Sequence, residues 1–328
     1  WRCRRRPRAG RRLWRDGSSR LYDMGDNRGN NRGDDGDEGR WGAGPGVVLV
    51  PSLINGSEIL DLLPGRSLVE TLRARGHRPL LLDWGSPGDT ERGFAVETYV
   101  TERLIPALDA AVAETGAPVV LAGYCMGGNL AMAAALAAAD RVRGLALLAA
   151  PWDFRTGGAL TAMAPALAAM LGPGRQPGLI PADWLHGVFA ALNPSLTLTK
   201  FADFAALDPD SEAARSFVAL EDWVNGGPAL ARRVAHDVLH GWYGRNDTAQ
   251  GAWQVAGCSV DPAALTMPAF AAVPQSDRIV PPGSADSLAR SLRRATVLRP
   301  NAGHVGMVVG RRRGLLHSAL GDWIDQRC

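Results

Sequence analysis

The sequence predicts an α/β protein in which a mostly parallel sheet carries helices on both faces. Three observations predict this class. Short, continuous apolar runs alternate with helical patterns, as expected for strands that are buried on both sides. A glycine-rich turn joins one of these runs directly to an Ala-rich helix, and a long helical stretch later interrupts the alternation. With 328 residues, the chain is long enough to bury a large core.

The expected elements follow one another from residue 47 onward, each strand a short apolar run and each helix a periodic one. Gly76 is the expected C-cap of the first helix. The expected strands cover residues 47–50, 79–83, 119–122, 145–149, 269–273 and 296–298. The expected helices lie around residues 67–75, 98–115, 126–139, 284–293 and 315–325.

Between Phe154 and about Asp261 the strand signals vanish and helical patterns replace them. We expect a helical cap, inserted over the carboxyl ends of the strands. Its tryptophans are expected to pack inside the cap, with the lining of an acyl-binding tunnel as the alternative. They are Trp184, Trp223, Trp242 and Trp253.

The predicted division of the chain therefore has three parts. Residues 45–154 and 262–328 form the α/β core, and residues 155–261 form the helical cap. Residues 1–44 are expected to be a disordered or extraneous amino-terminal tail, because residues 26–39 are low in complexity and cannot bury a core.

Composition excludes several classes of protein. The net charge of +3 gives no case for nucleic-acid binding, and no apolar run approaches the length of a membrane span. The cysteines lie far apart and show no metal-ligand spacing, which suits a reducing cytoplasm better than a disulfide framework. They are Cys3, Cys125, Cys258 and Cys328.

Residues 123–128 read Gly-Tyr-Cys-Met-Gly-Gly, after an apolar strand and before a helix. This is the context of a nucleophile elbow, in which a sharp turn exposes the nucleophile above the sheet. Cys125 occupies the position of the nucleophile, which indicates thiol acyl chemistry. A thiol needs a base and a carboxylate that orients the base.

Asp277 and His304 fall where this fold places the acid and the histidine, each in a loop after a late strand. We therefore predict Cys125, Asp277 and His304 as a catalytic triad. A turn residue at Asp277 and a structural histidine at His304 are the alternatives. The oxyanion hole is expected from the backbone N–H groups of Met126 and of a residue near Ile54.

Several segments together resemble the polyhydroxyalkanoate synthases of the α/β-hydrolase superfamily, in their small two-subunit form. They are Val-Pro-Ser-Leu-Ile-Asn at 50–55, Ile-Leu-Asp-Leu at 59–62, Leu-Asp-Trp-Gly at 82–85, the cysteine box, Asp-Arg-Ile-Val-Pro-Pro at 277–282 and Gly-His-Val-Gly at 303–306. The resemblance covers roughly residues 47 to 310.

This resemblance implies an acyltransferase that polymerises 3-hydroxyacyl-CoA through an acyl group on Cys125 and releases CoA. It implies a polyester product, no cofactor or metal, a homodimer, a second synthase subunit and a place at the surface of polyester granules in the cytoplasm. Two alternatives stay open. One is a cysteine-dependent ester, thioester or dienelactone-type lactone hydrolase, whose family shares the cysteine box. The other is a non-catalytic granule-associated protein.

Overall fold

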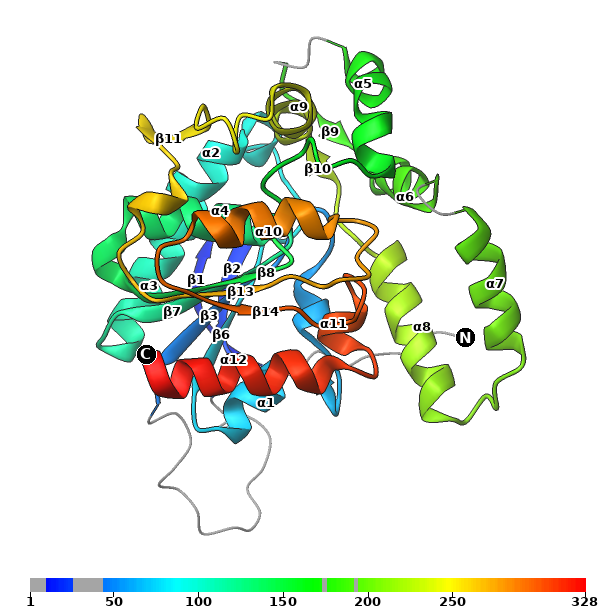
Figure 1. Cartoon of the computed structure of the whole chain (residues 1–328), viewed down its shortest axis with the longest axis horizontal. Coiled ribbons are helices and arrows are strands. Elements are labelled where there is room, and N and C mark those ends of the chain that lie inside the picture. Colours follow the sequence, from blue (N-terminus) through cyan, green and yellow to red (C-terminus); the bar gives the residue numbers. More distant parts are fainter. Residues whose placement is uncertain (1–9, 26–43, 173–175, 192–193) are drawn as a thin grey trace.

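The computed structural model describes residues 10–25, 44–172, 176–191 and 194–328, and it confirms the predicted α/β class. One sheet of eight strands, in the order β1-β2-β6-β3-β7-β8-β13-β14, runs through the molecule (Figure 1). All neighbours from β6 to β14 are parallel, and β1 and β2 form an antiparallel edge. The strands are β1 (Arg11–Asp16), β2 (Ser19–Asp23), β3 (Gly46–Val50), β6 (Arg78–Asp83), β7 (Val119–Tyr124), β8 (Val142–Leu148), β13 (Ala269–Ala272) and β14 (Ala295–Leu298).

Helices cover both faces of this sheet (Figure 1). One face carries α1 (Leu68–Ala74) and α12 (Arg313–Arg327), and the other carries α3 (Ile105–Thr115), α4 (Met126–Ala137) and α10 (Pro282–Ser291). Alternate residues of β3 pack against the helices on opposite faces of the sheet, because successive side chains of a strand point to opposite sides. Val48 and Val50 belong to the core cluster that contains α3 and α4, whereas Val47 and Leu49 belong to the cluster that contains α1 and α12.

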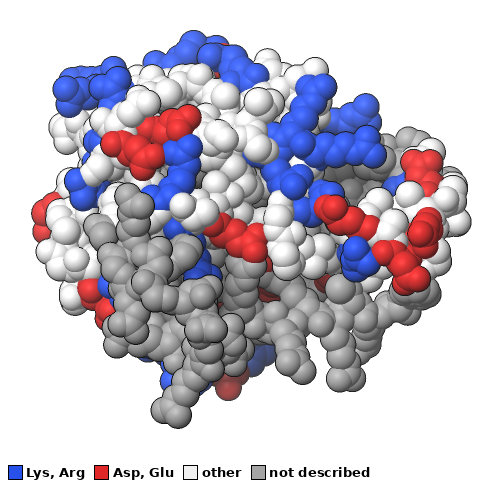
Figure 2. Space-filling view, turned by 90° about the horizontal axis from the view of Figure 1, so that it is seen from below, with Lys and Arg blue, Asp and Glu red and all other residues white. Residues whose placement is uncertain are grey.

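Shorter elements connect these layers. They are η1 (Ser57–Leu60), β4 (Asp61–Leu63), β5 (Arg66–Ser67), η2 (Glu91–Gly93), α2 (Val96–Tyr99), η3 (Val100–Leu104), η4 (Ala139–Arg141) and α11 (Gly306–Val309). Seen from the side of α1 and α12, acidic and basic side chains are interspersed (Figure 2). Arg75, for example, holds Asp322 and Asp325 at 2.6 Å each. Within the described residues, no helix is long and apolar enough to cross a bilayer.

The expectation of a disordered tail is wrong for residues 10–25. These residues form the β1–β2 hairpin, and Leu21 of β2 pairs with Leu82 of β6 and is fully buried. Asp23 is buried and accepts a 2.5 Å hydrogen bond from Arg78, so burial of a paired charge joins the hairpin to the sheet. The rest of the expected tail, residues 1–9 and 26–43, lies outside the described residues.

The chain between β8 and β13 is helical, with short strand pairs that the sequence did not indicate, and its helices lie beside and above the sheet (Figure 1). Trp242 and Trp253 are buried against Trp152 and Phe154, which fits the expectation of packing. The elements are α5 (Ala159–Leu171), β9 (Leu179–Ile180), α6 (Ala182–Ala191), α7 (Pro194–Ala205), α8 (Glu212–Asn225), β10 (Leu230–Ala231), α9 (Arg232–His236), η5 (Asp237–Arg245), β11 (Gln254–Val255), β12 (Cys258–Ser259) and η6 (Pro262–Ala264).

Candidate active site

Cys125 lies at the sharp turn between β7 and α4, with φ 55° and ψ −131°. A positive φ is strained for any residue with a side chain, at a cost of about 1–3 kcal/mol, and such strain is typical of functional positions. The Cys125 N–H donates to the carbonyl of Leu148 at 2.8 Å, and the Cys125 carbonyl accepts from Gly128 at 2.8 Å. Strand pairing on one side and the first helical turn on the other thus hold the strained residue in place.

The glycines of this turn are required by close backbone contacts. A Cβ on Gly123 would overlap the carbonyl of Gly127, and a Cβ on Gly127 would overlap the carbonyl of Val50 and lie 2.5 Å from that of Pro51. The turn therefore packs directly against the loop that follows β3. No side chain can separate these two segments.

Asp277 lies in the loop after β13, and its side chain is fully buried. Its Oδ1 accepts the backbone N–H groups of Ile279 at 2.8 Å and Val280 at 2.9 Å, while its Oδ2 lies 2.6 Å from Nδ1 of His304. One carboxylate oxygen thus fixes the acid in its own loop, and the other orients the imidazole.

The Asp277 and His304 loops are also joined through their backbones. Gln275 N–H donates to the carbonyl of Pro300 at 2.9 Å, and Ser276 N–H donates to that of Ala302 at 3.0 Å. These bonds continue the pairing of β13 with β14 beyond the strands. The acid and the imidazole therefore come from two loops that are fixed relative to each other.

His304 is buried, its Nδ1 is hydrogen bonded to Asp277, and its imidazole interacts with the neighbouring Cys125. Burial by itself lowers the pKa of His304, but the charges of Cys125 and Asp277 and the hydrogen bonds to both outweigh burial and raise it to about 10. The ring of Tyr124 lies against the imidazole at a centroid distance of 5.0 Å. The structure thus brings together the three predicted residues, and the surroundings favour a protonated imidazole beside the sulfur.

The two residues predicted for the oxyanion hole lie on either side of the contact between the turn and the β3 loop. Met126 is the first residue of α4, so its backbone N–H has no partner inside the helix. The N–H of Ile54 donates to Oγ of Ser52 at 3.3 Å, a long bond that another acceptor could replace. The role of both donors stays a prediction.

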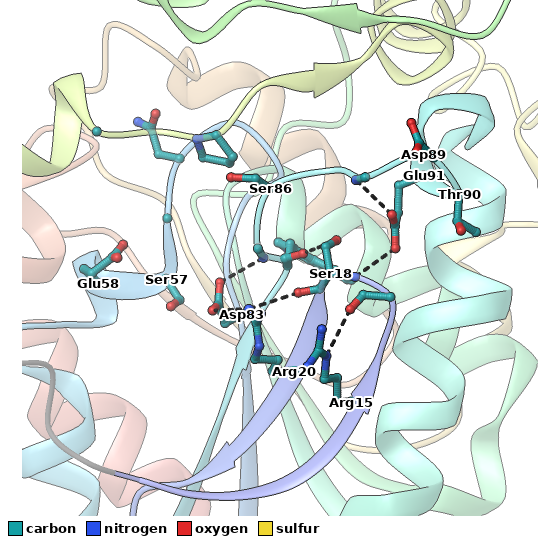
Figure 3. Close-up of a pocket in the computed structure, with 18 residues that line it drawn as sticks. Arg15, Ser18, Arg20, Ser57, Glu58, Asp83, Ser86, Asp89, Thr90 and Glu91 are labelled. Atoms are coloured by element: carbon teal, nitrogen blue, oxygen red, sulfur yellow. Dashed lines mark hydrogen bonds and ion pairs between the residues drawn. The ribbon is translucent and has the colours of Figure 1, made fainter.

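The larger cavity lies next to this loop and does not include Cys125, Asp277 or His304 (Figure 3). It measures about 720 Å³ and opens at the carboxyl ends of β3 and β6. Arg15, Ser18 and Arg20 of the hairpin lie at one side, with Asp83 and Glu91 beside them (Figure 3). Cations and carboxylates are mixed in its lining, which gives no clear preference for an anion or a cation.

One residue of the cap that the sequence did not indicate, Tyr243, also lies near the site. Tyr243 of η5 packs against Phe154 at a centroid distance of 4.6 Å and lines a small cavity with Ile279 and Val280. Burial raises the pKa of Tyr243, and the charge of Cys125 adds to this effect. Cys125 itself packs against the apolar cluster that contains Val280. In the sequence, Tyr243 lies in a helical pattern far from Cys125, so nothing there indicated that the two residues lie near each other.

Comparison with known proteins gives one family model and several relatives. Residues 47–313 match the model of the alpha/beta hydrolase family. A poly(3-hydroxyalkanoate) polymerase subunit PhaC of Synechocystis is 30% identical over 294 residues, covering 86% of this chain and 78% of that protein. A PhaC of Haloferax mediterranei is 30% identical over 299 residues, and this chain spans only 58% of its length.

Among solved structures, a putative non-heme bromoperoxidase BpoC of Mycobacterium tuberculosis superposes with a TM-score of 0.58 at 21% identity, covering 88% of this chain and 94% of that one. A monoacylglycerol lipase of Paleococcus ferrophilus superposes with a TM-score of 0.56 at 18% identity, covering 88% and 97%. At these identities the likeness supports the fold alone.

Proposed function

We propose that this chain, which belongs to the alpha/beta hydrolase family and within it to the poly(3-hydroxyalkanoate) polymerases, polymerises 3-hydroxyacyl-CoA. The reaction would pass through an acyl group on Cys125. The observation that carries this proposal is the imidazole of His304, which Asp277 holds at 2.6 Å and which interacts with the cysteine of the strained turn. The names of the relatives supply the substrate class.

In the first half-reaction, the thiolate of Cys125, whose proton already lies on His304, attacks the thioester carbonyl of the acyl-CoA. The carbon–sulfur bond to CoA breaks, the CoA thiolate takes the proton from the imidazolium, and an acyl-cysteine is left. Asp277 keeps Nδ1 protonated, so that Nε2 is the atom that accepts and returns the proton. We assign the oxyanion to the N–H groups of Met126 and Ile54, the latter after it leaves Ser52.

In the second half-reaction, the hydroxyl of another 3-hydroxyacyl unit attacks the acyl-cysteine. His304 removes the hydroxyl proton, a new ester bond forms, and the proton returns to the sulfur. The exchange of one thioester for another is nearly balanced in free energy, so a cysteine suits repeated transfer. If water replaces the hydroxyl, the same residues hydrolyse the thioester instead.

We further propose that residues 45–154 and 262–328, together with the hairpin of residues 10–25, form the catalytic core and that residues 155–261 form its cap. The relatives are named as subunits, which supports assembly with a second synthase subunit. Pairing with another copy of the chain is part of the same proposal. Light scattering of the purified chain, with and without added subunit, tests the assembly. Co-localisation with stained polyester granules tests a place at their surface.

The deciding experiment mixes the purified chain with 3-hydroxybutyryl-CoA and follows CoA release, insoluble polyester and free 3-hydroxybutyrate. Release of CoA with polyester supports the polymerase, and free acid alone supports a hydrolase. Cys125→Ala is expected to abolish CoA release. Cys258→Ala is the matched control, because Cys258 is also a free thiol but lies exposed away from His304. A Cys125→Ala protein that still forms polymer would contradict the assignment of the nucleophile.

A further inference from the structure

We propose that Trp223 of the cap is a positioning residue, which holds the loop of residues 54–58 so that the Ile54 N–H faces the reacting carbonyl. The inference rests on the proposed function, in which Ile54 gives one oxyanion donor. It assigns to the cap a part in catalysis beyond covering the site.

The contact is a hydrogen bond between segments far apart in the chain. The indole Nε1–H of Trp223 donates to the carbonyl of Gly56 at 2.8 Å. Trp223 lies near the end of α8, and this helix is docked on the core rather than free. Ala219 of α8 is buried in the same apolar cluster as Ile59 and Leu60, which directly follow the loop. The donor is therefore fixed relative to the sheet.

The chain that leaves α8 presses on the same loop. A Cβ on Gly227 would lie 2.8 Å from Oδ1 of Asn55 and 2.9 Å from the carbonyl of Ile54, so a side chain here would push on the loop. Oδ1 of Asn55 is buried and has no hydrogen-bond partner among the described residues. The side chain of Asn55 thus does not hold the loop, which leaves the cap to do so.

Two indoles bracket Ile54. On the core side, Nε1–H of Trp84 donates to the carbonyl of Pro51 at 3.0 Å, next to the contact between Pro51 and Gly127 of the turn. On the cap side, Trp223 holds Gly56. The chain before Ile54 is therefore tied to the turn at Gly127 through Pro51, and the chain after Ile54 is tied to the cap through Gly56, so the position of Ile54 depends on both.

The other side of the loop faces the 720 Å³ cavity, which Gly226 and Pro228 of the cap also line. Ser57 and Glu58 stand at the wall of the 720 Å³ cavity, opposite the hairpin residues (Figure 3). No side chain of the described residues fills that space and supports the loop from there. Loss of the Trp223 bond therefore allows the loop to move into the cavity, which would draw Ile54 away from Met126.

The first test measures the loop itself and needs no activity. Hydrogen–deuterium exchange of residues 52–58 is compared between the wild type, Trp223→Phe and the control Trp184→Phe, a half-buried tryptophan of α6. Trp223→Phe keeps an aromatic ring but removes the N–H. We expect about tenfold faster exchange of the loop in Trp223→Phe only, with α4 unchanged in all three. Unchanged exchange of the loop would overturn the proposal.

The second test separates binding from chemistry. In single turnovers with 3-hydroxybutyryl-CoA, Trp223→Phe is expected to slow CoA release by about 10- to 100-fold, less than the loss of a whole oxyanion donor. The KM should stay within about twofold, because the loop acts on the transition state. Trp223→His, which retains an N–H donor, should recover part of the rate. An equally slow release of CoA in Trp184→Phe, or a raised KM with an unchanged rate in Trp223→Phe, would count against a positioning role of Trp223.

The same measurements distinguish failure of the proposed function from failure of the proposal for Trp223. If the wild type releases no CoA, the proposed function fails, while the exchange data still decide whether Trp223 holds the loop. If Trp223→Phe does not fold, Gly227→Ala replaces it, because the added Cβ pushes on Ile54 and Asn55 without touching the core cluster. Normal exchange and normal CoA release in a folded Gly227→Ala protein would then overturn the proposal.

Discussion

Replacement of Asp277 by asparagine tests the arrangement around His304 most directly. The substitution keeps the size of the side chain and removes its charge. The N–H groups of Ile279 and Val280 both donate to Oδ1, so they select the amide oxygen of the new side chain. The amide NH₂ must then face Nδ1 of His304, across the present 2.6 Å contact.

The size of the effect follows from this geometry. An NH₂ donor facing Nδ1 forces the imidazole to carry its proton on Nε2, the atom that must accept the proton of Cys125. The wrong tautomer costs about 10³- to 10⁴-fold in the chemical step, which corresponds to about 4–5.5 kcal/mol. The loss of the Asp277 charge also lowers the pKa of His304 from its value of about 10.

The assay is a single-turnover measurement of CoA release, paired with the pH dependence of Cys125 alkylation by iodoacetamide. Asp286→Asn serves as the control, because Asp286 is a paired aspartate of α10 away from the imidazole. The expected result is a fall of at least about 10³-fold in Asp277→Asn alone. A rate within about tenfold of the wild type would refute the assignment of Asp277 as the residue that orients the base.

Three further predictions concern other parts of the chain. Gly127→Ala should lower stability by about 1–3 kcal/mol in urea unfolding, whereas Gly314→Ala, with open space around it, should not. At pH 7.5, ¹⁵N NMR should find His304 protonated, because its pKa is raised to about 10, and His317 neutral, because burial lowers its pKa to about 4. The contribution of His304 to the stability of the fold should be lost as the pH rises from about 6.5 through 10. Glu91→Gln should cost about 1–3 kcal/mol, because it removes one of the two carboxylates that pair with buried Arg103 and weakens the acceptor of the Ser18 N–H in the hairpin turn. A loss below about 0.5 kcal/mol would show that Glu91 does not help to hold the hairpin.

The sequence could predict the centre of the site because its constraints are local. The turn at Cys125 needs glycines where backbones touch, so the motif itself carries the geometry. Asp277 and His304 each follow a strand of a parallel sheet, and the carboxyl ends of such strands meet at one edge. The strand before the turn was expected at residues 119–122 and extends to Tyr124, a difference of two residues at one end.

The hairpin of residues 10–25 could not be predicted, because its stability comes from a distant partner. Its strands are short and rich in arginine, and only a few side chains, such as Leu21, enter the core. Their hydrogen bonds and the Asp23–Arg78 pair depend on β6, more than fifty residues later. The contact of Trp223 with Gly56 was hidden for the same reason, since 167 residues separate donor and acceptor.

The cap is not uniformly attached, and this bears on how substrate enters. The segment η5 is anchored by the packing of Trp242 on Phe154 and Trp253, and it carries Tyr243 close to Cys125. By contrast, Phe201 of α7 has half of its surface exposed. An opening for substrate is therefore easier at α7 than at η5 or at α8, whose Ala219 is buried in the core cluster. If Trp223 holds the loop that carries Ile54, a movement of α7 leaves this donor in place, because α8 stays docked on the core. The donor would then be ready whenever substrate enters, and the buried surroundings of Cys125 would limit the access of water, which favours transfer to a hydroxyl over hydrolysis.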